Sequence, residues 1–510
     1  MKKYVFILMT LATICTSCDD WLDVRGENIQ KEQDQFDSYK GFRDALTGCY
    51  MTMGSQDIYG LRLTMTDIES MADLWYFTES MATGSTAASL KAYLATHQYT
   101  EDVPLAAMKS IYGALFTTIT SANVLLKNID EKGGNIEDQK ARAVIEGEAL
   151  AIRAYCQLDL LRLFGQLPQG GTKQVKLPYS YTTSIDELPT YYDYAAYVQN
   201  LTADIERAES LLKDSDPIFT MTYTELNRPG TTAEDTYMYY RQSRLNYWAV
   251  RALHARMALY TGNTQAAYQI ATEIINAKGA DGNALITLSG VSDLRNGYNA
   301  LPSECLFYLS KYNVTEYATT SLIGGSTAQS RDFLYILSEN MLNELYASIP
   351  GATASHNRYL NLWNRTTLNP SGKVTPALKK YWYDESNLSS TLVSSNAATL
   401  ATKVQVIPML RLSEMYLIAM ETSNNLAEVQ QLYDTYMADH AYTLYTPFES
   451  IEQARAEIIN EYRRELFGEG QMFYTYKRTA AKTMMWNSKE ITEDDYIVPL
   501  PATEYDPNTK

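Results

Sequence analysis

The sequence has few of the residues that build metal centres and disulfide frameworks. Its 510 residues include only five Cys and four His. So few Cys in so long a chain do not form a disulfide scaffold. The His residues lie far apart, without a second His or a Cys at ligand spacing, and Asp-rich calcium loops are missing. We therefore predict no metal and no cofactor.

Recognisable catalytic motifs are absent as well. The chain has no Gly-x-Ser-x-Gly, His-Glu-x-x-His, Walker loop or Gly-x-Gly-x-x-Gly. The segments Gly165-Gln-Leu-Pro168 and Gly324-Gly325 are predicted to be turns, not phosphate loops. Paired carboxylates can hydrolyse glycosides, but 60 acidic residues single out no pair. We predict that the protein is not an enzyme. A surface glycosidase remains an alternative hypothesis.

Positive charge is scarce. Lys and Arg number 43 against 60 Asp and Glu, which gives a formal net charge of −17. Such a chain repels a phosphate backbone, so a nucleic acid partner is not expected. Hydrophobic residues at 45% and charged residues at 20% are typical of a globular protein. Tyr is unusually common, with 41 residues.

The one hydrophobic run that resembles a targeting signal lies at the start of the sequence. Lys2 and Lys3 precede an apolar segment at residues 4–14, which is shorter than the roughly 20 residues of a membrane span. Cys15-Thr-Ser-Cys18 follows, and a small residue before Cys is typical of a bacterial lipoprotein cleavage site. We predict a signal peptide at residues 1–17 and lipidation of Cys18. Cys15 follows the bulky Ile14 and fits less well, and a secreted protein cleaved elsewhere is the alternative.

Most of the remaining chain has the 3.6-residue hydrophobic period of α-helices. Leu245, Trp248, Ala252, Ala255 and Leu259 are spaced 3, 4, 3 and 4, which places them on one helical face. Helical segments also pair across tight turns, in a pattern similar to tetratricopeptide hairpins. The predicted pairs are residues 105–129 with 136–164, 252–260 with 266–275, and 414–421 with 426–436.

Irregular segments separate these hairpins. Residues 165–189 and 214–235 are interrupted by Pro and Gly, and residues 279–404 form the longest irregular stretch. Long loops on a rigid scaffold are where binding function usually lies.

Five blocks in order along the chain match a known family. They are Cys18-Asp-Asp-Trp-Leu-Asp23; the Phe42, Ala45, Leu46, Gly48 and Tyr50 pattern; residues 146–168, ending in aromatic-Gly-x-x-Pro; residues 244–277; and residues 411–419 and 461–478 with Pro499-Leu-Pro501 and Glu504. Together they resemble the SusD/RagB family of outer-membrane nutrient-binding lipoproteins. The sequence departs from the family pattern at three positions. The family usually has Arg at the position of Tyr462, Arg or His at that of Gln471, and Asp at that of Tyr474.

The resemblance implies a mainly α, SusD-like fold with a tetratricopeptide-type hairpin scaffold and long irregular loops. It implies one domain over residues 18–510, with family regions at about 19–230 and 240–510. Charged residues in its helices, among them Glu146, Glu148, Glu461 and Glu465, are expected to bridge helices rather than to catalyse.

The resemblance also implies a function. A lipid-anchored protein on the outer face of the outer membrane would capture a glycan and deliver it to a SusC-like TonB-dependent transporter. Asp19, Asp20 and Asp23, directly after the Cys, resemble the surface-export signal of Bacteroidetes lipoproteins. Peptide uptake, as in the RagB branch, is the alternative, and a helical-repeat adaptor that binds only protein is a further hypothesis.

Aromatic side chains in the irregular segments are the candidates for ligand contact. Sugar rings present flat C–H faces that stack on Trp and Tyr, while polar side chains bind the hydroxyls. Trp75 is the leading candidate, because the family often places this segment near the ligand. Each of these residues could instead be core, as we expect for Trp248. The other predicted ligand-binding residues are Tyr76, Tyr298, Tyr312, Trp363 and Trp382.

Overall fold

The computed structural model describes residues 32–76, 86–184, 187–230, 235–323, 335–366, 374–383 and 397–502. The predicted signal peptide and Cys18 lie outside the described residues. Within those ranges the chain is mainly α-helical, as predicted.

Two classes of helix make up the described chain. The longer helices are α3 (Tyr39–Met53), α5 (Thr86–Ala95), α6 (Asp102–Lys132), α7 (Gln139–Phe164), α8 (Tyr194–Lys213), α10 (Tyr247–Thr261), α11 (Thr264–Ile275), α19 (Leu412–Thr422), α20 (Leu426–Asp439) and α21 (Ile451–Glu465). The shorter α-helices are α2 (Glu32–Gln35), α4 (Asp67–Met71), α9 (Tyr223–Leu226), α12 (Gly290–Arg295), α13 (Val314–Ala318), α14 (Glu339–Leu345), α15 (Ala352–Ser355), α16 (Asn357–Asn361), α18 (Ala397–Lys403) and α22 (Met472–Arg478). Short 3₁₀ and π-helical turns lie between them: η2 (Gly133–Asn135), η3 (Pro217–Phe219), η4 (Arg241–Ser243), η5 (Pro302–Glu304), η6 (Thr319–Ile323) and η7 (Glu493–Tyr496).

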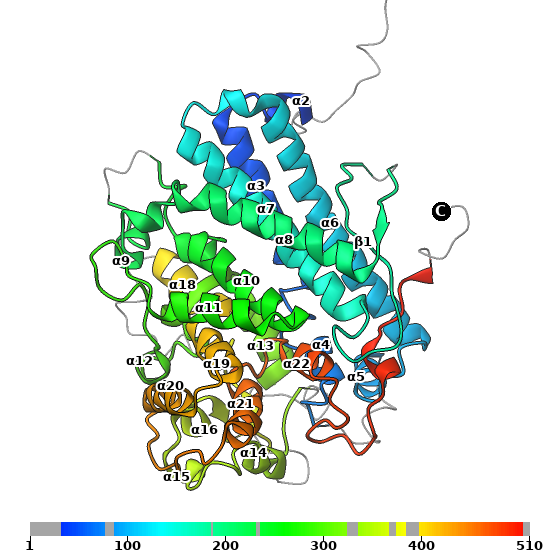
Figure 1. The fold of residues 1–510 in the computed structure, drawn as a ribbon, viewed down its shortest axis with the longest axis vertical. Coiled ribbons are helices and arrows are strands. Elements are labelled where there is room, and N and C mark those ends of the chain that lie inside the picture. The colour runs from blue at the N-terminus through cyan, green and yellow to red at the C-terminus, as the bar shows by residue number, and fades with distance from the viewer. Residues whose placement is uncertain are drawn as a thin grey trace, which may run out of the picture.

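The three predicted helical hairpins are confirmed. They are α6 with α7, α10 with α11, and α19 with α20, and in each the two helices pack against each other. Neighbouring hairpins are joined by α8, which contacts α7 and α10, and by the packing of α11 on α19. Figure 1 shows the resulting stack, from α3, α6, α7 and α8 at the top, through α10 and α11, to α19, α20 and α21 below.

Polar side chains fix where the hairpin helices begin. Asn246 accepts a hydrogen bond from the Ala249 amide and begins α10, and Asn263 accepts one from Ala266 and begins α11. These side chains satisfy amides that have no partner within the first helical turn. Gly262, with φ of +86°, ends α10 in the left-handed conformation that Gly adopts without strain. The turn between the two helices is therefore set by two consecutive residues, Gly262 and Asn263.

The prediction of one long irregular stretch at residues 279–404 is wrong in part. Strand β3 (Cys305–Ser310) crosses this region and pairs antiparallel with β6 (Val406–Arg411), so that Phe307 lies opposite Leu410. Each strand begins with five apolar residues and is almost wholly buried, a pattern that periodicity alone does not distinguish from a buried helix. Two further strand pairs are very short: β1 (Leu177–Pro178) with β2 (Tyr191–Tyr192), and β4 (Trp363–Asn364) with β5 (Ala377–Leu378).

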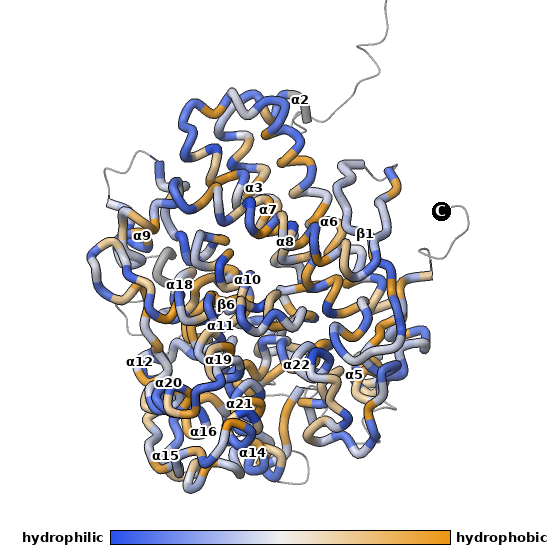
Figure 2. The backbone as a smooth tube through the Cα atoms, in the orientation of Figure 1, coloured by the Kyte–Doolittle hydropathy of each residue, from blue (hydrophilic) through white to orange (hydrophobic). Residues whose placement is uncertain are grey.

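The hydrophobic core is continuous through the stack. Buried apolar side chains from Phe36 to Leu500 form one cluster, which includes Leu226 and Leu245 on either side of the expected regional boundary. Figure 2 shows hydrophobic and hydrophilic residues alternating along the helices, as expected when one face of each helix packs inward. Among the described helices, none has both the length and the apolar character needed to cross a membrane.

Buried ion pairs link helices that are distant in sequence, as predicted. Glu148 of α7 pairs with Arg241, and Arg153 of α7 bonds Asp204 of α8 with both oxygens at 2.7 Å. The like-charged Glu461 and Glu465 are bridged by Arg358, which contacts both carboxylates. These charges hold elements together and lie in the core.

Gly470 lies where a side chain does not fit. Its φ is +74°, and a Cβ there would come within 2.1 Å of the Leu63 carbonyl oxygen. We expect Gly470→Ala to lower the free energy of unfolding by at least about 2 kcal/mol, because the left-handed conformation alone costs an L-residue about 1–2 kcal/mol. Denaturant unfolding followed by circular dichroism measures this loss.

The matched control for that substitution is Gly113→Ala on the exposed face of α6. A Cβ at Gly113 would have no neighbour within 4 Å. Because Ala is favoured over Gly inside a helix by about 0.5–1 kcal/mol, this change should stabilise the protein. Equal effects of the two substitutions would contradict the strained geometry at Gly470.

Candidate functional site

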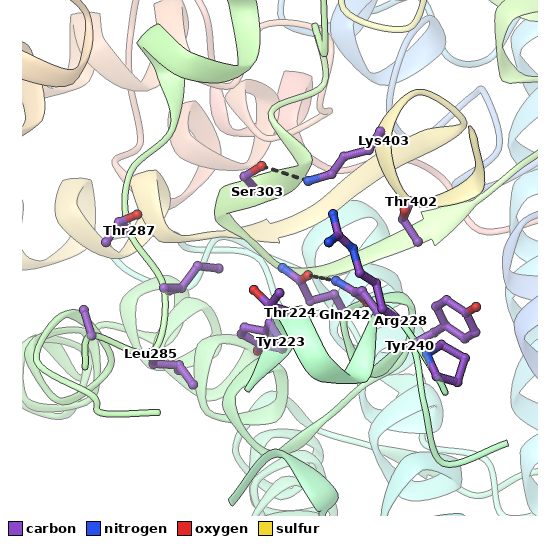
Figure 3. A pocket seen from close by; sticks show the side chains of 14 residues that line it. Tyr223, Thr224, Arg228, Tyr240, Gln242, Leu285, Thr287, Ser303, Thr402 and Lys403 are labelled. Atoms are coloured by element: carbon purple, nitrogen blue, oxygen red, sulfur yellow. Dashed lines mark hydrogen bonds between the residues drawn. The ribbon is translucent and has the colours of Figure 1, made fainter. Parts of the chain in front are cut away.

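A large cavity lies on the side of the molecule where α9 and α18 face each other. Its volume is about 810 Å³, within the range typical of small-molecule sites. Figure 3 shows its walls, which come from five separate segments of the chain. They are Tyr223, Thr224 and residues 227–229 at α9, Tyr240 and Gln242 at η4, residues 284–287, Ser303 in η5, and Thr402 with Lys403 at the end of α18.

Hydrogen bonds hold these walls in register. The Tyr240 amide donates to the Leu226 carbonyl at 2.9 Å. Gln242 Nε2 donates to the Cys305 carbonyl at 2.7 Å, which fixes the orientation of this side chain, and its Oε1 accepts from Asn227 Nδ2 at 2.7 Å (Figure 3). The amide network is thus anchored on strand β3, in the core of the protein.

Tyr240 has a strained backbone at the cavity wall. Its φ and ψ are +55° and +44°, a left-handed conformation that is uncommon for a residue other than Gly. Such strain persists only where the surrounding structure enforces it, and it concentrates at ligand sites. The half-buried ring of Tyr240 offers an aromatic surface at the wall. Burial raises the pKa of Tyr223 on the same wall, so its phenol remains protonated.

The lining of the cavity offers polar and apolar contacts to a bound molecule. Hydroxyl, amide, guanidinium and ammonium groups line the cavity together with apolar side chains. None of its fourteen lining residues is Asp, Glu, His or Cys. Glycoside hydrolysis uses two carboxylates across the scissile bond, and this cavity offers none. Within the described ranges, no group of three or more His, Cys, Asp or Glu is arranged to hold a metal ion.

Trp75, the leading candidate from the sequence, lies in the core. Only 2% of its surface is exposed, and its Nε1 donates to the Met65 carbonyl at 3.2 Å. Tyr335 and Phe467 pack against its ring edge to face, at 6.0 and 5.0 Å between centroids. Because its ring is covered, Trp75 is not available to stack on a sugar here. The prediction of ligand contact is therefore corrected to a packing role.

Trp363 requires the same correction. It is 3% exposed, and its ring packs edge to face on Phe467 at 5.2 Å between centroids. Trp75 packs on the same Phe467 ring. The two indoles together enclose Phe467, which precedes the Gly468–Gly470 turn. Sequence reasoning placed both in loops, but their loops fold onto the α21 C-terminus.

The remaining four candidates keep some exposure. Tyr298 is half-buried and lies next to the cavity, since Lys403 Nζ is 5.7 Å from its ring centre. Trp382 is half-buried, and its carbonyl accepts from Asn299 Nδ2 at 2.8 Å, directly beside Tyr298. Tyr312 is 81% exposed after β3, whereas Tyr76 is half-buried with its amide on the Ile336 carbonyl at 2.7 Å. None of these four residues is among the fourteen that line the cavity, although Tyr298 contacts the lining residue Lys403.

The cavity residues Tyr223, Arg228, Tyr240, Gln242 and Lys403 were missed by the sequence reasoning. The Pro- and Gly-interrupted segment at residues 214–235 was recognised as irregular, and it supplies one wall. The sequence signal nearest to the cavity is the group of Tyr237, Tyr239 and Tyr240, which follows this segment directly. No sequence pattern indicates that residues 402–403 would face this wall.

Comparison with solved structures places the fold. A SusD superfamily protein from Bacteroides thetaiotaomicron superposes with a TM-score of 0.66 at 19% identity, over 92% of this chain and 98% of that one. A putative sugar-binding protein from Bacteroides vulgatus gives 0.63 at 20% identity, over 92% and 96%. A laminarin-binding SusD-like protein gives 0.56 at 16% identity, over 91% and 96%.

Sequence comparison alone finds no such relationship. No protein-family model matches the chain, and no curated protein matches it. The structural likeness nevertheless extends over nearly the whole length of both chains, which confirms the resemblance drawn from the five sequence blocks at the level of the fold. The chain has the fold of the SusD superfamily.

Proposed function

We propose that this protein is a non-catalytic, glycan-binding receptor for nutrient uptake. The cavity of Figure 3 is the observation that carries this proposal. Its polar lining can bind sugar hydroxyls, and the ring of Tyr240 can stack on a sugar face. None of the fourteen lining residues has a carboxylate that could hydrolyse a glycan. Two structural neighbours named for sugar or laminarin binding support the same class of ligand.

The cellular role is proposed from the sequence resemblance. We place the protein on the outer face of the outer membrane, anchored through lipid on Cys18, with residues 1–17 removed and residues 18–510 as one domain. A SusC-like TonB-dependent transporter would receive the captured glycan. Tyr298, Trp382, Tyr312 and Tyr76 remain proposed ligand contacts, with Tyr298 the nearest to the cavity.

Peptide capture is the second candidate function. A peptide would use the same aromatic surfaces together with hydrogen bonds to its backbone. The Gln242 and Asn227 amides could pair with a peptide backbone as well as with hydroxyls. The absence of acidic side chains from the fourteen lining residues gives this cavity no partner for basic peptides, so a glycan fits better.

The test is retardation of the purified protein in native gels that contain single polysaccharides, with peptide mixtures examined by calorimetry. We expect at least one polysaccharide to bind and Tyr240→Ala to weaken it by roughly tenfold, the scale of one lost aromatic contact. Tyr181→Ala, which removes an exposed ring that is neither in the cavity lining nor among the proposed ligand contacts, is the control and should change little. If peptides release heat on binding in calorimetry and no glycan retards the protein, the peptide alternative would replace this function.

A further inference from the structure

Two positively charged side chains lie on facing walls of the cavity. Arg228 extends from the end of α9, and Lys403 ends α18 on the other side (Figure 3). Lys403 Nζ donates to Ser303 Oγ at 3.2 Å and lies 5.7 Å from the ring centre of Tyr298. Arg228 is exposed. Within the described part of the chain, neither side chain forms an ion pair with a carboxylate.

The carboxylates near these walls are engaged elsewhere. Glu225 accepts from the amide and hydroxyl of Thr222 at 2.7 and 2.8 Å, and Asp281 accepts hydrogen bonds within its own loop. These hydrogen bonds lower the pKa of both groups. Asp293 is buried and accepts from the amide and hydroxyl of Ser303 at 2.9 and 2.8 Å. The lining itself therefore carries Arg228 and Lys403 and no acidic side chain, while the carboxylate of Asp293 lies behind Ser303.

We propose that this cavity selects a saccharide that carries an acidic group, either a carboxylate or a sulfate. The inference rests on the proposed glycan-binding function and adds the class of glycan. A guanidinium binds a planar carboxylate or a sulfate through two parallel hydrogen bonds, and an ammonium adds a second, adaptable charge. The exposed hydroxyls of Thr224 and Thr287 remain for the neutral part of the sugar.

The acidity of the whole protein does not oppose this selection at the site. The net charge of −17 is spread over the full chain, and salt screens charges beyond a Debye length of about 8 Å at physiological ionic strength. An acidic group inside the cavity would instead lie between walls that carry Arg228 and Lys403. Long-range repulsion should slow the encounter with a polyanion, whereas the direct contacts set the affinity.

The experiment uses pairs of polymers that differ only in charge. Polygalacturonate is compared with its methyl-esterified form, and dextran sulfate with dextran, by affinity electrophoresis and calorimetry on the purified protein. We expect one acidic polymer to bind at least about tenfold more tightly than its neutral partner, because hydrogen bonds between charged groups are about twice as strong as neutral ones. The polymer that binds distinguishes a carboxylate from a sulfate as the recognised group.

Substitutions identify the residues responsible. Arg228→Gln and Lys403→Gln should each remove most of the preference for the acidic polymer, whereas Arg228→Lys and Lys403→Arg should retain part of it. Lys109→Gln removes one charge from the exposed face of α6, outside the cavity, and should leave the preference unchanged. Thermal unfolding of each variant confirms that the fold is retained.

The outcomes separate this inference from the function on which it rests. Binding of neutral polymers alone would overturn the acidic preference and leave glycan binding standing. Binding of peptides and of no glycan would overturn both. An acidic preference that survives Arg228→Gln and Lys403→Gln, or that falls equally with Lys109→Gln, would overturn the assignment to this cavity, since it would report a general attraction for polyanions.

Discussion

Replacement of Arg411 by Met is expected to lower the free energy of unfolding by about 3–5 kcal/mol, the cost of removing one partner from a buried ion pair. Arg411 is 1% exposed and lies at the end of β6. Its Nη1 bonds Glu465 at 2.6 Å and also contacts Glu304, while its Nη2 bonds Glu469 at 2.8 Å. Without this guanidinium, three buried carboxylates lose a shared cation. Denaturant unfolding near pH 7.5 measures the loss.

A second substitution tests the charge explanation directly. Burial raises the pKa of Glu304 to about 7 even with Arg411 nearby, so its ionised form is the most costly of the three. Addition of Glu304→Gln to the Arg411→Met variant should therefore recover part of the lost stability. Recovery would attribute the loss to uncompensated charge, whereas a purely steric defect would show none.

An exposed ion pair provides the matched control. Lys40 and Asp44 lie one turn apart on α3, 3.0 Å from each other, with side chains that are 80% and 54% exposed. Lys40→Met should change stability by less than about 0.5 kcal/mol, because water already solvates both charges. If Arg411→Met were no more harmful than Lys40→Met, the cluster around Arg411 would not be an element of stability.

The helical scaffold could be predicted because its signals are local. Asn246 begins α10, the adjacent Gly262 and Asn263 form the turn to α11, and the apolar spacing of each helix needs no distant partner. Burial in the loops cannot be deduced in this way. Trp75 is covered by Tyr335 and Phe467, some 260 and 390 residues further along the chain, so only the tertiary fold decides its exposure.

The cavity could not be predicted for the same reason. Its walls join α9, η4, η5 and the end of α18, which are adjacent only after β3 has paired with β6. That strand pair was itself missed, since five consecutive buried apolar residues in each strand have no alternating pattern. The role of the acidic and basic residues in the helices could be predicted, because a charged side chain is buried only when it is paired.

The three departures from the family pattern meet at one place in the structure. Tyr462, Gln471 and Tyr474 all line a small internal cavity of about 20 Å³. Arg162 donates to Gln471 Oε1 at 2.9 Å and lies 3.9 Å from the ring centre of Tyr474. A cation–π contact thus stands where the family usually has a carboxylate. These changes act on the packing of α22 against α7, and they lie outside the lining of the candidate site.

Replacement of His356 by Phe is expected to protect the protein against mild acid. The His356 ring is 0% exposed and packs against Tyr346, His440 and Tyr442 at 5.3–5.6 Å. Burial, followed by the positive charge of Arg358, lowers the pKa of His356 to about 2. The folded state therefore keeps this ring neutral, whereas the unfolded chain takes up a proton near pH 6.5.

The sign of the pH dependence follows from that difference. Below pH 6.5 the unfolded chain binds one more proton at this position than the folded protein, so stability falls as the pH falls. At pH 4.5 the loss amounts to about 3 kcal/mol, since each pH unit below 6.5 contributes about 1.4 kcal/mol. His440, Glu461 and Arg464 also face the ring, and their influence is already contained in the lowered pKa. The Phe variant lacks the titrating group and should lose this part of the slope.

The comparison is made by denaturant unfolding of the two proteins at several pH values between 7.5 and 4.5. In the described ranges neither nitrogen of the His356 ring has a hydrogen-bond partner, so Phe should be tolerated at neutral pH and should relieve two unsatisfied polar atoms. Tyr442→Phe alters the same aromatic cluster without removing a group that titrates in this window, and it should leave the acid slope unchanged. If His356→Phe and the original protein lost stability in parallel as the pH fell, the ring would have to be protonated in the folded state. The buried aromatic cluster would then contain a charged ring or a water molecule, and this result would contradict the neutral ring inferred from its packing.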